Sequence, residues 1–163
     1  MNDFTVEVKG LDALSKKLKL LPERFASRGM RRALRRGANV IRDAARNNAK
    51  RFDDPKTSNA IYKNIVVQGG GRRLERQNGG PLMRVGVLGG ARDYSAYGEI
   101  KTGRSGRLNP GGDTWYWRFL EFGTSEHAAK PFLRPALASS AEQALSVIVS
   151  SASDELDKEL NKL

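Results

Sequence analysis

Titratable side chains outside the predicted helices are the first candidates for chemistry in this sequence. Acid–base catalysis needs a convergent pair of such groups, and a nucleophilic triad also needs a histidine. The candidates are Asp53, Asp54, Asp93, Glu99, Asp113, Glu121 and His127. Their spacing matches no catalytic or metal-binding motif, and the chain has a single histidine and no cysteine. We therefore predict no enzymatic activity, with no catalytic residue, no cofactor and no metal site.

Some of these acidic positions have a simpler structural explanation. The Asp-Asp pair at 53–54 stands directly before Pro55, which is typical of a turn that ends a helix. Glu121 lies inside an aromatic run, so we predict a buried carboxylate that is paired with a cation. Arg118 and Arg134 are the candidates for that cation.

The densest set of charged side chains follows helical spacing between residues 24 and 50. This arginine ridge consists of Arg24, Arg28, Arg31, Arg32, Arg35, Arg36, Arg42, Arg46 and Lys50, with Asp43 as its only acid. Like charges four residues apart on a helix cost about 0.2 to 0.5 kcal/mol per pair, so several such pairs need an offset. Phosphates of a nucleic acid, acidic side chains of the same subunit or acidic side chains of a neighbouring subunit would supply it. A plain solvated face is the remaining alternative.

The overall charge also points to an acidic partner. Lys and Arg number 29 against 18 Asp and Glu, which gives a formal charge of +11. No aromatic residues interleave the ridge, which counts against single-stranded nucleic acid. Double-stranded DNA bound by the helix at 24–50 is therefore one functional hypothesis. Its candidate contacts, to DNA or to another subunit, are Arg28, Arg31, Arg35, Arg42 and Arg46.

Hydrophobic periodicity predicts the elements that must position these groups. Alternation over residues 4–8 predicts an opening strand, and leucines at helical spacing predict a short helix over residues 11–21. A longer helix is predicted over residues 23–51. Its apolar stripe is rich in alanine and glycine, so we expect a sheet or another helix to approach it closely. The stripe consists of Met30, Ala33, Leu34, Gly37, Ala38, Ile41, Ala44 and Ala45.

The later elements alternate with glycine-rich connections. A helical turn is predicted before a strand at 65–68, and a second strand at 83–87. Residues 115–122 predict a short helix capped by Asp113 or Thr114, with a central strand as the alternative. A long closing helix follows Pro131 and Pro135. Its stripe is Ala141, Leu145, Ile148, Ala152, Leu156 and Leu160.

These elements predict an α+β fold in one domain over residues 1–163. We expect a small mixed or antiparallel sheet of about three to four strands, packed against two long helices. Residues 69–80 and 89–113 are predicted to be flexible loops. No stretch has the run of apolar residues that a membrane span needs, so we expect no membrane contact. The absence of cysteine is consistent with a reducing compartment.

One segment carries a family resemblance. The run at 115–124 reads WYWRFLEFGT and the run at 129–137 reads AKPFLRPAL. Together they resemble the signature of the tail-component, or tail-completion, family of HK-type lambdoid bacteriophages with long tails. The signature positions are Trp117, Glu121, Phe122, Gly123, Thr124, Pro131, Phe132, Arg134 and Pro135. The chain departs from the family pattern at 57–61, which lacks a glycine and a leucine, and in a longer insertion at 98–113.

The resemblance implies a virion structural protein. It implies a homo-oligomer, a hexameric ring at the head-proximal end of the tail, that completes the tail and joins it to the head. Tail-tube and head-connector proteins would be its partners, and it would reside in the virion, after assembly in the host cytoplasm. From the residues themselves, the signature segment is a structural corner, with Pro131 and Pro135 fixing the start of the last helix and Phe132 filling the core beneath it.

Overall fold

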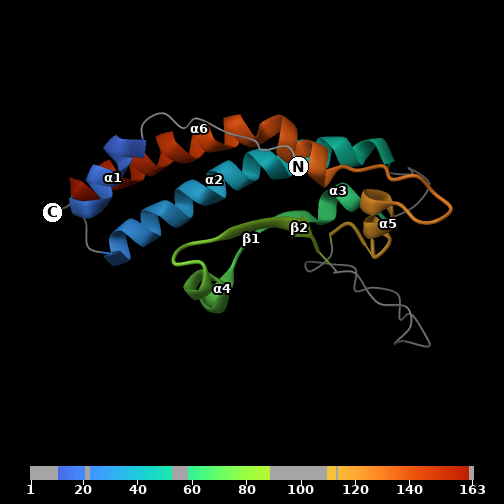
Figure 1. The fold of residues 1–163 in the computed structure, drawn as a ribbon, viewed down its shortest axis with the longest axis horizontal. Coiled ribbons are helices and arrows are strands. Elements are labelled where there is room, and N and C mark those ends of the chain that lie inside the picture. Colours follow the sequence, from blue (N-terminus) through green and yellow to red (C-terminus); the bar gives the residue numbers. More distant parts are fainter. Residues whose placement is uncertain (1–10, 21–22, 53–58, 89–109, 113, 162–163) are drawn as a thin grey trace. The chain divides into compact units, whose positions relative to one another are not determined.

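The computed structural model describes residues 11–20, 23–52, 59–88, 110–112 and 114–161 (Figure 1). In chain order the elements are α1 (Leu11–Leu20), α2 (Glu23–Ala49), the 3-10 helix η1 (Lys50–Phe52), α3 (Ile61–Asn64), β1 (Ile65–Gly69), α4 (Gly71–Gln77), β2 (Met83–Val87), α5 (Trp117–Phe122) and α6 (Leu133–Leu160). The chain divides into two compact units. The first combines Met1–Val40, Val67–Arg84 and Ser140–Leu163, and the second combines Ile41–Val66 and Val85–Ser139. The single domain over 1–163 stays a prediction.

The long helices follow the predicted periodicity. The helices predicted over 11–21 and 23–51 are confirmed as α1 and α2, and the closing helix is confirmed as α6. Pro135 lies in the first turn of α6, where its missing N–H leaves no donor to satisfy. The predicted strand at 4–8 lies outside the described residues.

The described part of the sheet has two strands, β1 and β2, and the count of three to four stays a prediction because residues 4–8 are not described. Gly70 N–H donates to the Leu82 carbonyl, and Leu88 N–H donates to the Asn64 carbonyl. Later residues of β2 therefore pair with earlier residues of β1, so the two strands are antiparallel. The broad α+β class is confirmed, with helix predominating.

The connection between the two strands contains helix α4, where the sequence led us to predict a loop over 69–80. Its central residues are good helix formers, and glycines with positive φ, Gly71 and Gly79, stand at its two ends. Asn78 closes the last turn, because its side-chain amide donates to the Leu74 carbonyl at 2.8 Å. Most of the second predicted loop, 89–113, lies outside the described residues.

The aromatic run after this segment is helical, so the strand alternative is wrong. Helix α5 begins at Trp117 behind Tyr116, not behind Asp113 or Thr114, and the preceding side chain makes no capping hydrogen bond. Thr114 is instead buried and accepts a hydrogen bond from Asn64. Gly123 ends the helix with φ 78° and ψ −179°, a backbone region that is open almost only to glycine.

The core of the first unit lies between α1, α2 and α6. Its buried residues are Leu14, Ala33, Ala152 and Leu156, with Met30 and Leu160 packed at their edge. The predicted close approach is confirmed at Gly37, where a Cβ atom would collide with Ile148 and would lie 2.8 Å from the Ala144 carbonyl oxygen. Contact between α2 and α6 therefore depends on backbone proximity rather than on large side chains.

The core of the second unit gathers around the start of α6. Its fully or almost fully buried residues are Ala45, Ala49, Ile61, Ile65, Phe132 and Ala136. Val85 and Val87 of β2 pack against them, as do Tyr116 before α5 and Trp117 in α5. Phe132 is completely buried, as the sequence predicts, and Asn48 donates to its carbonyl from the end of α2.

Candidate functional site

Glu121 is the most deeply buried charged group of the signature segment. Its side chain is 1% exposed and lies at the start of α6. Its carboxylate accepts backbone hydrogen bonds from Phe132 at 2.8 Å, Leu133 at 2.9 Å and Arg134 at 3.0 Å. The next residue is a proline without an N–H, so one carboxylate satisfies every backbone donor from 132 to 135. Glu121 thus caps α6 from a distant position in the sequence.

Arg134, rather than Arg118, is the cation that pairs with Glu121. Its Nε lies 3.2 Å from the Glu121 carboxylate, and its Nη2 donates to the Glu121 carbonyl. Arg118 is exposed on α5. Burial raises the pKa of Glu121, but the three backbone donors and Arg134 outweigh it, and the pKa lies below its ordinary value of 4.5. The carboxylate is therefore ionised at neutral pH and structural.

The remaining signature residues shape the turn between α5 and α6. Thr124 Oγ1 accepts hydrogen bonds from the backbone of Glu126 and His127, and Thr124 N–H donates to the His127 carbonyl. A Cβ atom on Gly123 would lie 2.9 Å from both the His127 carbonyl oxygen and the Ala129 nitrogen. These contacts form a tight corner between α5 and α6, and His127 lies at its exposed edge. A purely structural role for the segment stays a prediction.

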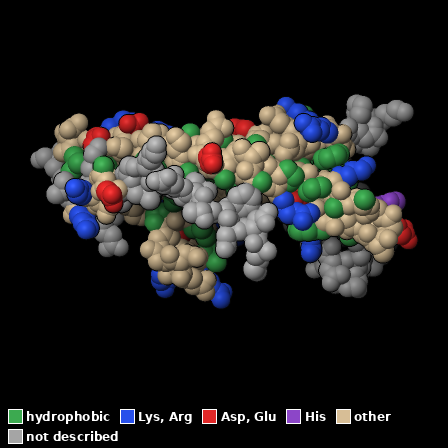
Figure 2. Space-filling view, turned by 45° about the horizontal axis from the view of Figure 1, so that its top comes forward, with side chains coloured by type: hydrophobic (Ala, Val, Ile, Leu, Met, Phe, Trp, Pro, Cys, Tyr) green, Lys and Arg blue, Asp and Glu red, His purple; other side chains and the backbone are tan. Residues whose placement is uncertain are grey.

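Next to this corner the second unit exposes an apolar patch. Phe119 is 46% exposed, Phe122 is 62% exposed and Leu137 is 55% exposed. The Arg134 guanidinium lies 5.3 Å from the centre of the Phe122 ring, and Leu137 follows Arg134 by one helical turn. In Figure 2, hydrophobic side chains (green) lie beside Lys and Arg side chains (blue) in the part of the molecule that carries the histidine (purple). We call Phe119, Phe122 and Leu137 the aromatic patch.

The arginine ridge is offset in part by acids of the same chain. Glu155 on α6 is 3% exposed and accepts from Arg32 at 2.8 Å and from Arg36 at 3.0 Å, with Lys158 at 3.6 Å. The hydrogen bond from Arg32 outweighs burial and holds the pKa of Glu155 below its ordinary value. The alternative of an acidic partner within the same chain is thereby confirmed for these two arginines.

The five ridge arginines proposed as contacts differ in their surroundings. Arg31 pairs with Glu75 of α4 at 2.7 Å, and Arg42 pairs with its neighbour Asp43 at 2.8 Å. Arg46 donates two hydrogen bonds to the Ile65 carbonyl, so it fixes the start of β1. Arg28 also has an interaction, whereas Arg35 is exposed and has no hydrogen-bond or ion-pair partner among the described residues. Contact of these residues with DNA or another subunit stays a prediction.

Asn64 is a buried polar residue that the sequence gave no reason to select. Its amide donates to the Gly112 carbonyl at 2.9 Å and to Thr114 Oγ1 at 2.8 Å, while its Oδ1 accepts from Gly111 N–H at 2.7 Å. Its own carbonyl accepts from Leu88. Asparagine at the end of a short helix carries no sequence signal that distinguishes this role from ordinary capping.

Together these features define a small, basic, mostly helical α+β protein whose buried charges cap and join helices. A model of the family described as "Bacteriophage HK97-gp10, putative tail-component" matches residues 12–123, and the chain belongs to this family. It is therefore a bacteriophage tail component. The match ends at Gly123, so the second half of the signature, from Thr124 to Pro135, lies beyond it.

Comparison with curated proteins and with solved structures gave no match. Within the described part of the chain, no three His, Asp or Glu side chains are grouped to hold a metal ion. None of the described helices combines the length and apolarity required to cross a membrane.

Proposed function

We propose that this tail component forms a hexameric ring at the head-proximal end of the tail, where it completes the tail and joins it to the head. The observation that supports self-association is the aromatic patch, because two exposed phenylalanines and a leucine beside a rigid corner are typical of an interaction surface. The Glu121 cap supports the same proposal, since it holds α5 and the start of α6 in fixed positions. A ring needs such a fixed surface on every copy.

The ring is tested directly with the purified full-length protein. Native mass spectrometry and negative-stain imaging should show a closed oligomer, alone or after addition of tail tubes, and binding to tail-tube or head-connector proteins in the mixture. A protein that remains monomeric and unbound under both conditions would contradict the proposal. A virion location requires in addition that the protein be found in purified particles after assembly in the host cytoplasm.

The patch gives a sharper prediction. Phe122→Ser should weaken self-association about ten- to a hundredfold, because burying a phenylalanine contributes about 1.5 to 3 kcal/mol. Concentration-dependent sedimentation or native mass spectrometry measures this change. The thermal midpoint of the single chain should change little, because Phe122 is 62% exposed there.

The matched control is Gln143→Ser on the exposed surface of α6, which removes a polar side chain of similar size outside the patch. It should leave the oligomer intact. If both variants assemble as the unchanged protein does, the aromatic patch is not the contact.

Contact with double-stranded DNA through the helix at 24–50 is the second proposal. The supporting observation is that Arg35 on α2 keeps an uncompensated charge among the described residues in a chain with a formal charge of +11. Duplex binding should then weaken steeply as salt increases and on charge reversal at Arg35 and Arg42. Binding that is independent of salt would contradict it.

A further inference from the structure

The described arginines of the first unit differ in their surroundings. Those of α2 that face α6 are engaged, since Glu155 accepts from Arg32 and Arg36. Those of α4 are exposed, and Arg72, Arg73 and Arg76 have no hydrogen-bond or ion-pair partner in the part of the chain that the structure describes. Among the described residues of this unit, the largest group of cations without such a partner therefore lies on α4, not on the long helix.

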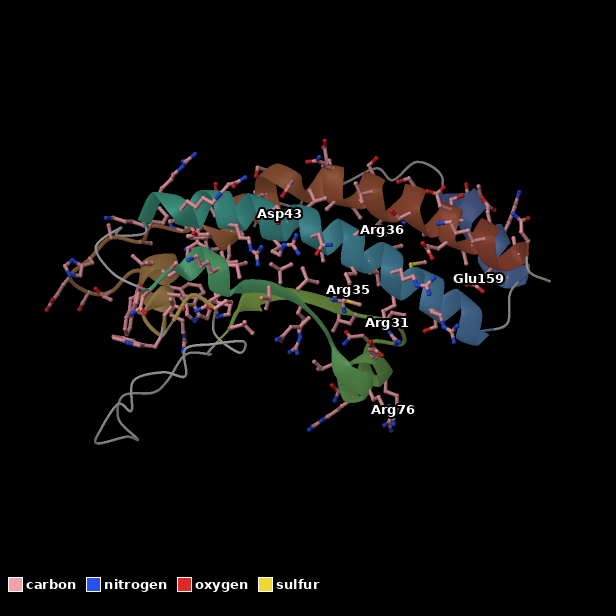
Figure 3. The ribbon with its side chains drawn as sticks, turned by 180° about the vertical axis from the view of Figure 1, so that it is seen from behind. Arg31, Arg35, Arg36, Asp43, Arg76 and Glu159 are labelled. Atoms are coloured by element: carbon pink, nitrogen blue, oxygen red, sulfur yellow. The ribbon has the colours of Figure 1, made fainter. Side chains whose placement is uncertain are left out.

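The one acidic residue of α4 does not neutralise this group. Glu75 is bound by Arg31 of α2 at 2.7 Å, and its side chain is only 17% exposed. The same ion pair brings α4 to the side of α2 from which Arg31 and Arg35 extend (Figure 3). Arg35 is one helical turn after Arg31, on the side of α2 that carries Arg31.

The surroundings of these cations suit a phosphate backbone better than a folded protein. The core of a protein interface normally contains aromatic or aliphatic anchors, yet the exposed large hydrophobic side chains among the described residues, Phe119, Phe122 and Leu137, all belong to the other unit. Positions 69, 71, 79 and 80 are glycines with open space where a Cβ would be, so the backbone beside α4 is accessible to a bulky ligand.

The spacing of the arginines also fits a polyanion. Arg72 and Arg76 are four residues apart on one face of α4, a rise of about 6 Å. One DNA strand carries a phosphate about every 3.4 Å along the duplex axis, so two such cations can contact phosphates of one strand together. Arginine offers two parallel donors to each phosphate. No aromatic residue is present on α4 to stack on exposed bases, which favours a duplex over a single strand.

We propose that Arg72, Arg73 and Arg76 of α4, extended by Arg35 of α2, form a phosphate-binding surface for duplex DNA. The inference rests on the proposal of DNA contact above and moves that contact from the face of the long helix to the connection between the strands. It requires no base recognition, so the affinity should be independent of DNA sequence and should fall steeply as the salt concentration rises.

The test compares two triple variants of the full-length protein by fluorescence anisotropy on a labelled duplex of mixed sequence. Arg72→Ala/Arg73→Ala/Arg76→Ala should weaken binding about tenfold or more, and should reduce the slope of log affinity against log salt by about 2.7, between about 50 and 200 mM salt. The control, Arg51→Ala/Arg118→Ala/Lys130→Ala, removes three exposed cations of the other unit and so the same net charge. It should change affinity far less.

A variant that should tighten DNA binding provides a second, independent test of the proposal. Glu75→Gln releases Arg31 next to the α4 arginines, so it should tighten duplex binding several-fold and steepen the salt slope by about 0.9. Circular dichroism and native mass spectrometry should show the unchanged fold and assembly for all three variants. The side chains replaced in the two triple variants have no hydrogen-bond or ion-pair partner among the described residues, and Glu75→Gln keeps the size of the side chain.

The outcomes separate this inference from the proposals that precede it. If the unchanged protein does not bind duplex DNA, the DNA-contact proposal fails and this one fails with it, while ring formation is unaffected. If the unchanged protein binds but both triple variants weaken it equally, only the α4 assignment is overturned. Competition by polyglutamate as effective as competition by duplex DNA at equal charge would overturn it in favour of an acidic protein partner.

Discussion

Replacement of Glu121 by alanine should lower the free energy of unfolding by about 3 kcal/mol or more. The substitution leaves the N–H groups of residues 132–134 without an acceptor at a buried helix end, and each unsatisfied donor costs about 1 to 3 kcal/mol. It also leaves Arg134 without its carboxylate. Chemical denaturation followed by circular dichroism measures the loss.

The matched control is Glu126→Ala, which removes an exposed carboxylate a few residues away in the same corner. It should change stability by less than about 0.5 kcal/mol, as exposed substitutions usually do. Glu121→Gln should lie between the two, because an amide keeps one acceptor oxygen but turns a donor toward the backbone N–H groups. Equal stabilities of all three variants would show that the cap contributes nothing.

The same carboxylate predicts the direction of the pH dependence. The pKa of Glu121 is lower in the folded state than its ordinary value of 4.5, so the folded state favours the ionised form. Its contribution is fully present above the unfolded pKa and is lost as the pH falls through the folded pKa. Glu155 behaves in the same way, because Arg32 holds its pKa down. Stability should therefore decrease in acid below about pH 4.5, and less steeply for Glu121→Gln.

Gly37→Ala should destabilise the protein by about 2 kcal/mol, although alanine is the better helix former. The added Cβ would lie 2.7 Å from Ile148 Cδ1 and 2.8 Å from the Ala144 carbonyl oxygen. Ile148 can adopt another rotamer, but a helix backbone cannot, so α2 and α6 must separate. The cost of that separation exceeds the helix-propensity gain of about 1 kcal/mol.

Gly29 on the same helix provides the control with the opposite sign. A Cβ there would lie 3.5 Å from Glu155 Cβ, which is ordinary van der Waals contact. Gly29→Ala should therefore raise the free energy of unfolding by about 0.5 to 1 kcal/mol through helix propensity. Thermal denaturation of the two variants should move in opposite directions, and a stabilised Gly37→Ala would contradict close helix contact at this position.

The sequence predicts the elements with strong local signals. Apolar residues at helical spacing predict α1, α2 and α6, and the alternation of Met83, Val85 and Val87 predicts β2. Helix α4 is missed because the glycine runs on either side of it are the usual sign of a loop, while its own seven residues contain one apolar side chain, Leu74. A helix without a periodic apolar face leaves no pattern in the sequence.

The sequence predicts a contact of the site only where the type of a residue and its neighbours in the chain require a partner. A carboxylate in an aromatic run had to be satisfied, so burial and pairing of Glu121 follow, but the choice of Arg134 over Arg118 depends on the tertiary fold. The ridge required an offset, yet nothing local indicates that Glu155 provides part of it. Asn64 was missed because its partners, Gly111, Gly112 and Thr114, are far away in the chain.

Asn64 has a consequence for how this protein tolerates variation. Its backbone carbonyl accepts a hydrogen bond from Leu88 N–H, and its side-chain oxygen accepts one from Gly111 N–H. One residue therefore binds two positions that are far apart in the chain. A single substitution such as Asn64→Ala would remove three hydrogen bonds at once and leave the Gly111 N–H and Thr114 Oγ1 without this partner. Because an unsatisfied buried donor costs about 1 to 3 kcal/mol, position 64 should tolerate little variation.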